Sequence, residues 1–232
     1  MKNSIQPPLS YQILKTVPVY SKNEPFVSVS DLGIPNGYIF PMVDMKPLFK
    51  KNILVRMTVA LMLKKAQNYC TNINKNWSLF LTYGYRSPSI QKKLFKKEWN
   101  RIKILNPNLR RKELYEKTHA IIAVPAVAGH PTGGAIDICL LNQNDNTFLS
   151  MGTPIYDFQN PAISMDFKNI QKQDMKNRLL LRNILVSVGF APFDGEWWHF
   201  SYGDKEWAAY YQKQFAVYQQ VDITDIKIIK RL

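Results

Sequence analysis

The sequence is poor in cysteine, in histidine and in long apolar runs, and these shortages narrow the classes of protein it can encode. Its 232 residues include only two cysteines, Cys70 and Cys139, which are too few for a disulfide framework or a structural zinc site rich in Cys. No apolar stretch approaches eighteen residues, so no transmembrane helix is expected. There is no internal repeat, and a hydrophobic content of 46% can fill a real core, so we expect one globular unit.

The N-terminal region lacks the apolar core of a secretory signal, because residues 1–15 contain Lys2 followed by many polar residues and prolines. Cytoplasmic residence is therefore expected, and the low cysteine content agrees with a reducing compartment. Periplasmic residence is the alternative if a leader has been removed. Residues 1–45 hold six prolines and are predicted to form an N-terminal extension that wraps the core, whereas residues 46–232 are predicted to form the main domain.

The net charge of +14 is concentrated in one segment. Between Lys50 and Lys117 the sequence has 17 Lys or Arg residues and three Glu, so the rest of the chain is neutral overall. Such a segment can attract an anionic polymer such as nucleic acid or cell wall. A charge run is more often the solvated face of a helix, and no nucleic-acid partner is expected.

The spacing of apolar residues predicts a mixture of helices and strands. Ser87 followed by Pro88 is a typical start signal of a helix. Predicted helices cover residues 47–69, 88–100 and 174–187, and predicted strands cover 38–42, 77–83, 135–141 and 197–202. Their order has no strict βαβ alternation, so the sequence predicts an α+β fold with helices packed on a small central antiparallel sheet.

Three residues form a candidate zinc site. His130 and Asp137 lie seven positions apart in a Gly-rich stretch, and His199 follows about sixty residues later. Two imidazoles and one carboxylate match a catalytic zinc, which keeps its fourth position open for water. Taken singly, a His or an Asp is more often a hydrogen-bonded core or surface residue than a metal ligand.

Two further side chains complete a hydrolytic set. Glu196 lies three residues before His199, close enough to take a proton from a metal-activated water. Positions i and i+3 do not share a face of a regular strand, so the chain is predicted to bend here, and Gly195 makes a bend inexpensive. Arg86 lies on a predicted strand-to-helix turn and is the candidate for stabilising an oxyanion.

Other reactive or aromatic side chains have simpler explanations. His119 lies outside both motifs, and Cys139 is interpreted as a buried thiol rather than a fourth ligand. Trp197 and Trp198 are expected in the core and the pocket wall rather than in a nucleic-acid stacking surface. Ser87 is better explained as a helix cap than as a nucleophile.

Five stretches occur in a recognisable order: Gly84–Arg86, His130–Asp137, Met151–Pro154, Asn177–Phe190 and Glu196–His199. Together they resemble the motifs of the zinc D-alanyl-D-alanine dipeptidases of the vancomycin-resistance (VanX) type, a family related to D,D-carboxypeptidases and to hedgehog-like zinc domains. The resemblance runs from about residue 47 to residue 205. It implies that residues 46–232 form a zinc peptidase domain with the hedgehog/D,D-peptidase-like fold.

The resemblance also implies roles for single residues. One zinc ion per chain is expected on His130, Asp137 and His199, with Glu196 as catalytic base and Arg86 stabilising the tetrahedral intermediate. The implied reaction is hydrolysis of D-Ala-D-Ala to two D-alanines, so the expected partner is a small D-amino-acid dipeptide.

The sequence departs from the family pattern at two positions, and rival functions stay open. Ala128 stands where the family usually has Ser, and Tyr83 stands where Asp is common. One alternative is a D,D-carboxypeptidase or endopeptidase that trims peptidoglycan stem peptides. A non-enzymatic zinc-binding module is less favoured, because a purely structural zinc site has no need of Glu196 and Arg86.

Overall fold

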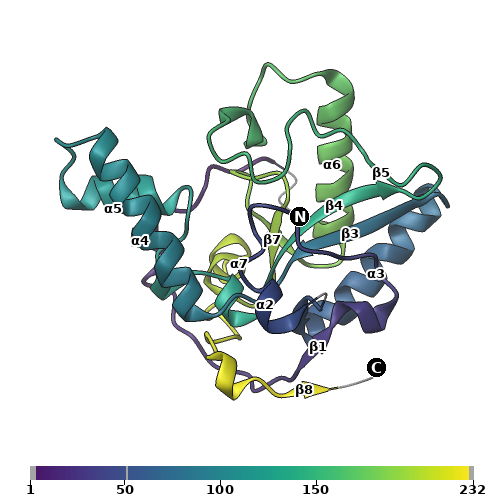
Figure 1. The fold of residues 1–232 in the computed structure, drawn as a ribbon, viewed down its shortest axis with the longest axis horizontal. Coiled ribbons are helices and arrows are strands. Elements are labelled where there is room, and N and C mark those ends of the chain that lie inside the picture. The colour runs from purple at the N-terminus through teal and green to yellow at the C-terminus, as the bar shows by residue number, and fades with distance from the viewer. Residues whose placement is uncertain (1–3, 51, 230–232) are drawn as a thin grey trace.

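The computed structural model describes residues 4–50 and 52–229 (Figure 1). Lys51 of the basic segment and the outermost residues of the two predicted domains lie outside this part of the chain. Within it, no helix is both long enough and apolar enough to cross a membrane.

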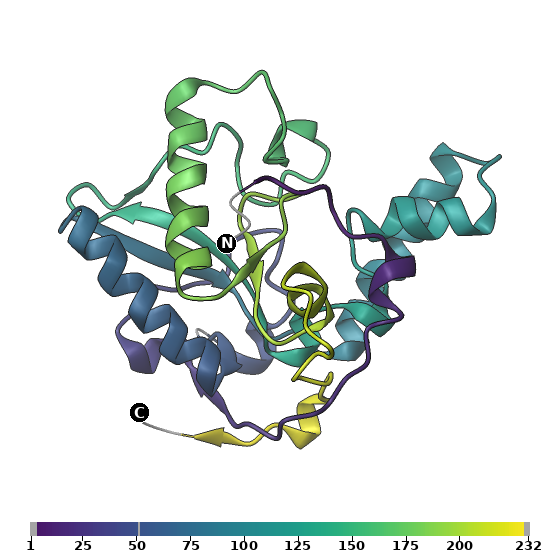
Figure 2. The ribbon, with the colours of Figure 1, turned by 180° about the vertical axis from the view of Figure 1, so that it is seen from behind.

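The centre of the molecule is an antiparallel sheet in the order β3-β4-β7-β6, with β5 paired to β4. Its strands are β3 (Trp77–Tyr83), β4 (Ala135–Asn142), β5 (Thr147–Phe148), β6 (Ala191–Pro192) and β7 (His199–Ser201). Helices α3 (Met57–Ile73) and α6 (Lys172–Ser187) contact each other and cover one face of this sheet (Figure 2). The predicted α+β fold with a small antiparallel sheet is confirmed.

A second, smaller sheet has the order β2-β1-β8, formed by β1 (Phe26–Ser28), β2 (Leu54–Arg56) and β8 (Ile228–Ile229). Strand β2 lies inside the helix predicted over residues 47–69, which was therefore wrong in its first half. Only the short α2 (Lys46–Phe49) and then α3 are helical. All three side chains of β2 are buried, and Arg56 stacks on Phe26 of the neighbouring strand, 4.4 Å from the ring centroid. Pairing with a distant strand overrode the local pattern.

The strand predicted near residues 38–42 is not formed. Phe40 is 82% exposed, and within the described part of the chain the only strand-like pairing nearby is a single bridge between Asn36 and Leu81. Without a neighbouring strand, this apolar run has no ladder of hydrogen bonds to join.

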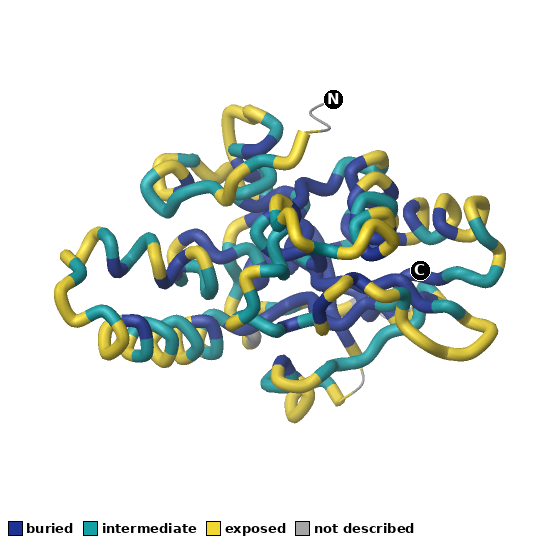
Figure 3. Tube along the Cα trace, turned by 90° about the horizontal axis from the view of Figure 1, so that it is seen from above, coloured by how far each residue is buried: buried dark blue, intermediate teal, exposed yellow. Residues whose placement is uncertain are grey.

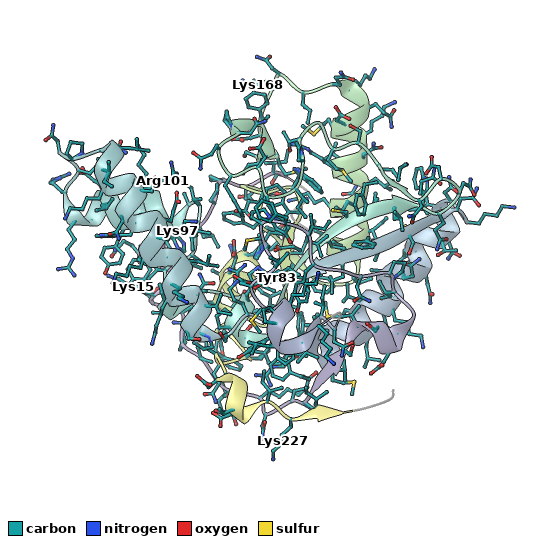
Figure 4. All side chains as sticks on the ribbon, viewed as in Figure 1. Lys15, Tyr83, Lys97, Arg101, Lys168 and Lys227 are labelled. Carbon is teal, nitrogen blue, oxygen red and sulfur yellow. The ribbon has the colours of Figure 1, made fainter. Side chains whose placement is uncertain are left out.

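Helices α4 (Pro88–Leu105) and α5 (Arg111–His119) form a hairpin that projects from the body and, with its connecting loop, carries 10 of the 17 Lys and Arg residues of the basic segment (Figures 1 and 3). Ser87 caps α4 as predicted, because its hydroxyl accepts a hydrogen bond from the Ile90 amide at 3.3 Å. Lys97 and Arg101 lie on the hairpin well away from Tyr83 in the body (Figure 4).

The N-terminal segment runs across the surface between the body and this hairpin (Figure 2). The Gln6 amide donates to the Asp194 carboxylate at 2.8 Å, and the Tyr11 amide, in the short α1 (Tyr11–Leu14), donates to Glu116 of α5 at 2.9 Å. The segment thus connects the loop before β7 with the hairpin.

Candidate metal centre and its pocket

Strand pairing places two of the candidate ligands side by side. Asp137 of β4 is the register partner of His199 on β7 and of Tyr83 on β3. The Nδ1 atom of His199 lies 2.9 Å from Oδ1 of Asp137, although 62 residues separate them in the sequence. A directly opposed antiparallel pair brings side chains into contact in this way.

His130 reaches the same point from a 3-10 turn (His130–Thr132) that leads into β4. Its Nδ1–H donates to the carbonyl oxygen of Gly84 at 2.8 Å, which leaves Nε2 with its lone pair facing Asp137 Oδ2 at 3.6 Å. Gly84 must lack a side chain, because a Cβ there would lie 2.5 Å from the Leu54 carbonyl oxygen.

The three donor groups fit a tetrahedral metal ion. Ligand atoms of His130, Asp137 and His199 all lie within 4.8 Å of one another. Bonds of about 2.0 to 2.1 Å to a tetrahedral zinc place ligand atoms about 3.3 Å apart, close to the separations of 2.9 and 3.6 Å seen here. Nitrogen and carboxylate donors suit zinc, so the residues present fit the ion.

The groups around Asp137 favour its ionised form, which is the form that binds a metal. Burial opposes its ionisation, but the neighbouring imidazoles outweigh burial and hold its pKa well below the usual range. Burial also lowers the pKa of His130, which keeps that ring neutral. Asp137 and His130 thus have the protonation states that metal binding needs, whereas Asp137 overcomes burial and raises the pKa of His199 to about 9, so that a metal must displace a proton from His199.

Glu196 lies at the turn between β6 and β7, as the predicted bend required. Its amide donates to the Phe193 carbonyl at 3.0 Å, and the His199 amide donates to the Glu196 carbonyl at 3.2 Å. The side chain is 9% exposed, and burial raises its pKa to about 8. A carboxylate with a raised pKa beside the ligands can both accept and return a proton.

Arg86 enters the same pocket from the turn after β3 and is held by two neutral side chains. Its Nε donates to the Tyr83 hydroxyl at 3.2 Å, and Nη1 donates to Gln91 Oε1 at 2.9 Å. The Tyr83 hydroxyl in turn donates to the Asp44 carboxylate. Among the described residues Nη2 has no hydrogen-bond partner, so it remains available to a ligand in the pocket.

One pocket joins these groups. Arg86, the three candidate ligands and Glu196 line it together with several residues that the sequence reading did not select: Met42, Gln91, Phe158, Phe193 and Glu206. No motif identifies them, because they come from helix α4, from loops and from α7 (Lys205–Tyr210), which only the fold brings together.

Comparison with known proteins identifies the family. Residues 46–221 match the peptidase M15 family, described as D-Ala-D-Ala dipeptidase. The chain belongs to this family. It is therefore a zinc metallopeptidase, as the resemblance implied.

Individual relatives agree with this assignment. The chain is 24% identical to a D-alanyl-D-alanine dipeptidase of Synechocystis sp., over 88% of this chain and 92% of the relative. It is 29% identical to one of Enterococcus faecalis, over 66% of this chain and 75% of the relative. Among solved structures it is similar to the LD-carboxypeptidase LdcB, with 18% identity and a TM-score of 0.43 over 90% of this chain and 81% of that chain. The family assignment rests on the sequence match.

Two of the stretches that resemble the family motifs, Met151–Pro154 and Asn177–Phe190, help to hold the turn before β7 in place. The guanidinium of Arg178 on α6 donates through Nε to the Met151 carbonyl at 2.7 Å and through Nη2 to the Thr153 hydroxyl at 3.3 Å. Trp197 donates through Nε1 to the same hydroxyl at 3.0 Å. These contacts fasten the turn that carries Glu196 to helix α6.

The other reactive or aromatic residues considered in the sequence analysis lie in surroundings that indicate structural roles. Cys139 is 3% exposed, and burial raises the pKa of its thiol beyond the range of a reactive one. The Nδ1 atom of His119 accepts a hydrogen bond from the Val124 amide at 3.1 Å at the pocket edge. Trp197 and Trp198 are buried, and Trp198 lines the pocket.

Proposed function

We propose that this M15 peptidase hydrolyses D-Ala-D-Ala to two D-alanines. The observation that carries the proposal is the meeting of a three-donor metal site, a buried carboxylate and a partly unbonded guanidinium in one pocket. The match to the D-Ala-D-Ala dipeptidase family supports the choice of substrate.

We assign Nε2 of His130, Nδ1 of His199 and the carboxylate of Asp137 as the metal ligands. Both of these nitrogens face that carboxylate. A zinc ion bound there would polarise the scissile carbonyl and lower the pKa of a water molecule. The contact of His130 Nδ1 with Gly84 fixes the tautomer that leaves Nε2 free.

Glu196 and Arg86 perform the remaining steps in this proposal. Glu196 takes a proton from the attacking water and delivers it to the leaving amino group, so the same carboxyl acts first as base and then as acid. Arg86 offers Nη2 to the carbonyl oxygen as that atom becomes negative, because its Nε and Nη1 are already held by Tyr83 and Gln91.

A D,D-carboxypeptidase or endopeptidase acting on peptidoglycan stem peptides is the second candidate. Ala128 lines the pocket and offers no hydroxyl where the family resemblance expects Ser, so one substrate contact is missing. A pocket altered at this point could accept a longer substrate.

One product analysis separates the two candidates. Zinc-loaded protein is incubated with D-Ala-D-Ala and with a stem pentapeptide that ends in D-Ala-D-Ala, and free D-alanine is measured. We expect release from the dipeptide. Release from the pentapeptide alone would establish a D,D-carboxypeptidase, and no release from either would refute both the dipeptidase and the D,D-carboxypeptidase.

We also propose the organisation and location of the chain. Residues 46–232 are assigned to the peptidase domain, and residues 1–45 to an extension that wraps it. The pairing of β1 with β2 and the contact of Gln6 with Asp194 support the wrapping of residues 1–45 around the domain. Cytoplasmic residence is proposed because the low cysteine content suits a reducing compartment, and no nucleic-acid partner is proposed.

A further inference from the structure

Helix α4 of the projecting hairpin presents lysines on one side only. At about 100° per residue, five of its lysines fall within an arc of about 140° around the helix axis, and all five are exposed. We call this set the lysine face: Lys92, Lys93, Lys96, Lys97 and Lys103.

The acidic residues of the hairpin do not neutralise the lysine face, because each has another partner. Glu98, the only acidic residue in α4, lies on the opposite side of the helix and accepts a hydrogen bond from Nε of Arg101 at 2.9 Å. Glu113 pairs with Arg110, and Glu116 is bound by two backbone amides of the N-terminal segment. Among the described residues, none of the five lysines forms an ion pair.

The tip of the hairpin adds apolar surface to this charge. Ile104 and Leu105 end α4 at the far end from the body, and they are 78% and 63% exposed (Figure 1). By the same helical geometry Ile104 lies within the arc of the lysine face. Removing two large aliphatic side chains from water is favourable, so the tip favours a partner that has an apolar layer.

This combination fits an anionic lipid surface better than a nucleic acid. A lipid bilayer offers phosphate charge at its surface and hydrocarbon beneath it, whereas a polyanion dissolved in water offers only the charge. Single-stranded nucleic acids are commonly bound by aromatic stacking, but Phe95 and Trp99 of α4 pack on Tyr115 of α5 within the hairpin.

We propose that the lysine face, together with Ile104 and Leu105, binds the enzyme to a membrane surface rich in anionic phospholipids. The lysine ammonium groups are attracted to the lipid phosphates, and the two tip side chains enter the interface. None of these seven residues lines the metal pocket, so the membrane contact does not use the proposed catalytic groups.

The test measures binding of the full chain to vesicles by co-sedimentation. Vesicles of phosphatidylglycerol mixed with phosphatidylcholine are compared with vesicles of phosphatidylcholine alone, at about 0.1 M salt. We expect binding to the anionic vesicles only. The triple variant Lys92→Gln, Lys96→Gln, Lys103→Gln should lower the partition coefficient on the order of 100-fold, because each basic residue near such a surface contributes about fivefold.

A second triple variant removes the same charge from the body of the molecule. Lys64→Gln and Lys65→Gln change exposed residues of α3, and Lys168→Gln changes an exposed residue that lies far from Lys97 of the hairpin (Figure 4). This matched control should bind anionic vesicles nearly as wild type does, because salt screens charges that lie more than about 10 Å from the lipid. Thermal unfolding of each variant verifies that it is folded.

A tip variant separates a lipid surface from a soluble polyanion. Ile104→Ser with Leu105→Ser should weaken binding to anionic vesicles at least about 10-fold, since two aliphatic side chains no longer enter the interface. Binding of the same variant to inorganic polyphosphate should equal that of wild type.

Three results would overturn the proposal. The first is that wild type fails to bind the anionic vesicles, or binds both kinds of vesicle equally. The second is an equal loss of binding in the two triple variants. The third is full vesicle binding by the tip variant, which would identify the lysine face as a site for polyanions in general.

Discussion

Asp137 and His199 are directly opposed across antiparallel strands, with Oδ1 and Nδ1 2.9 Å apart. The sheet itself therefore supplies two of the three proposed metal ligands, and His130 supplies the third from the turn before β4. Rigid strands hold the ligand atoms in place before any ion arrives, which lowers the cost of binding.

Replacement of a ligand should remove the metal and the activity together. In His130→Ala the site keeps one imidazole and one carboxylate, so the affinity for zinc should fall by orders of magnitude. Zinc measured after gel filtration should drop from about one per chain to near zero. A His130→Ala protein that retains stoichiometric zinc would contradict the ligand assignment.

Replacement of the proposed base should separate zinc from turnover. Glu196→Gln keeps the side-chain shape but cannot accept a proton, so kcat should fall at least ~10²-fold, the scale of general base catalysis. Zinc content should not change. Equal loss of zinc in this variant and in His130→Ala would show that Glu196 supports the metal rather than the proton transfer.

The hydroxyl of Tyr83 should matter only through Arg86. In Tyr83→Phe the guanidinium loses the acceptor of its Nε, and we expect kcat to fall about 2- to 10-fold with a smaller change in KM. A double-mutant cycle supplies the readout: in an Arg86→Ala background, Tyr83→Phe should have little further effect. Additive losses would mean that Tyr83 acts independently of Arg86.

The ion pair of Arg182 and Asp194 should stabilise the turn that precedes Glu196. Both side chains are at most 2% exposed, and they form two hydrogen bonds of 2.7 and 2.9 Å. Arg182→Met leaves a buried carboxylate unpaired and should lower the free energy of unfolding by about 3–5 kcal/mol in urea titration. Arg101→Met breaks a partly exposed pair on the hairpin and should cost less than about 1 kcal/mol. Equal losses in the two variants would refute this account.

The extent to which the sequence predicts the molecule depends on how local each signal is. Ser87 with Pro88 identified a helix start, and the apolar run of β4 identified a central strand, because caps and buried runs are local features. Strand β2 was wrongly predicted as helix because its structure depends on pairing with β1. The paired residues of the two strands are at least 26 positions apart in the sequence. A three-residue strand carries too little pattern to reveal that pairing.

The same distinction between local and non-local signals applies to the candidate site. Motif spacing selected the candidate ligands, Glu196 and Arg86, and the fold brings all of them into one pocket. The residues that hold Arg86 could not be found by spacing, since Asp44 and Gln91 approach Tyr83 and Arg86 from separate segments. Glu206 was missed for a similar reason, because a lone Glu near the start of a short helix looks like any solvated charge.

The most direct test of the account is a zinc titration of chelated, metal-free protein while release of D-alanine from D-Ala-D-Ala is measured. We predict no release without metal, a linear rise, and a plateau at about one zinc per chain, as a single three-ligand catalytic site requires. Absence of D-alanine at every zinc level, or release that is unaffected by removing the metal, would contradict the assignment of this pocket as a zinc dipeptidase site.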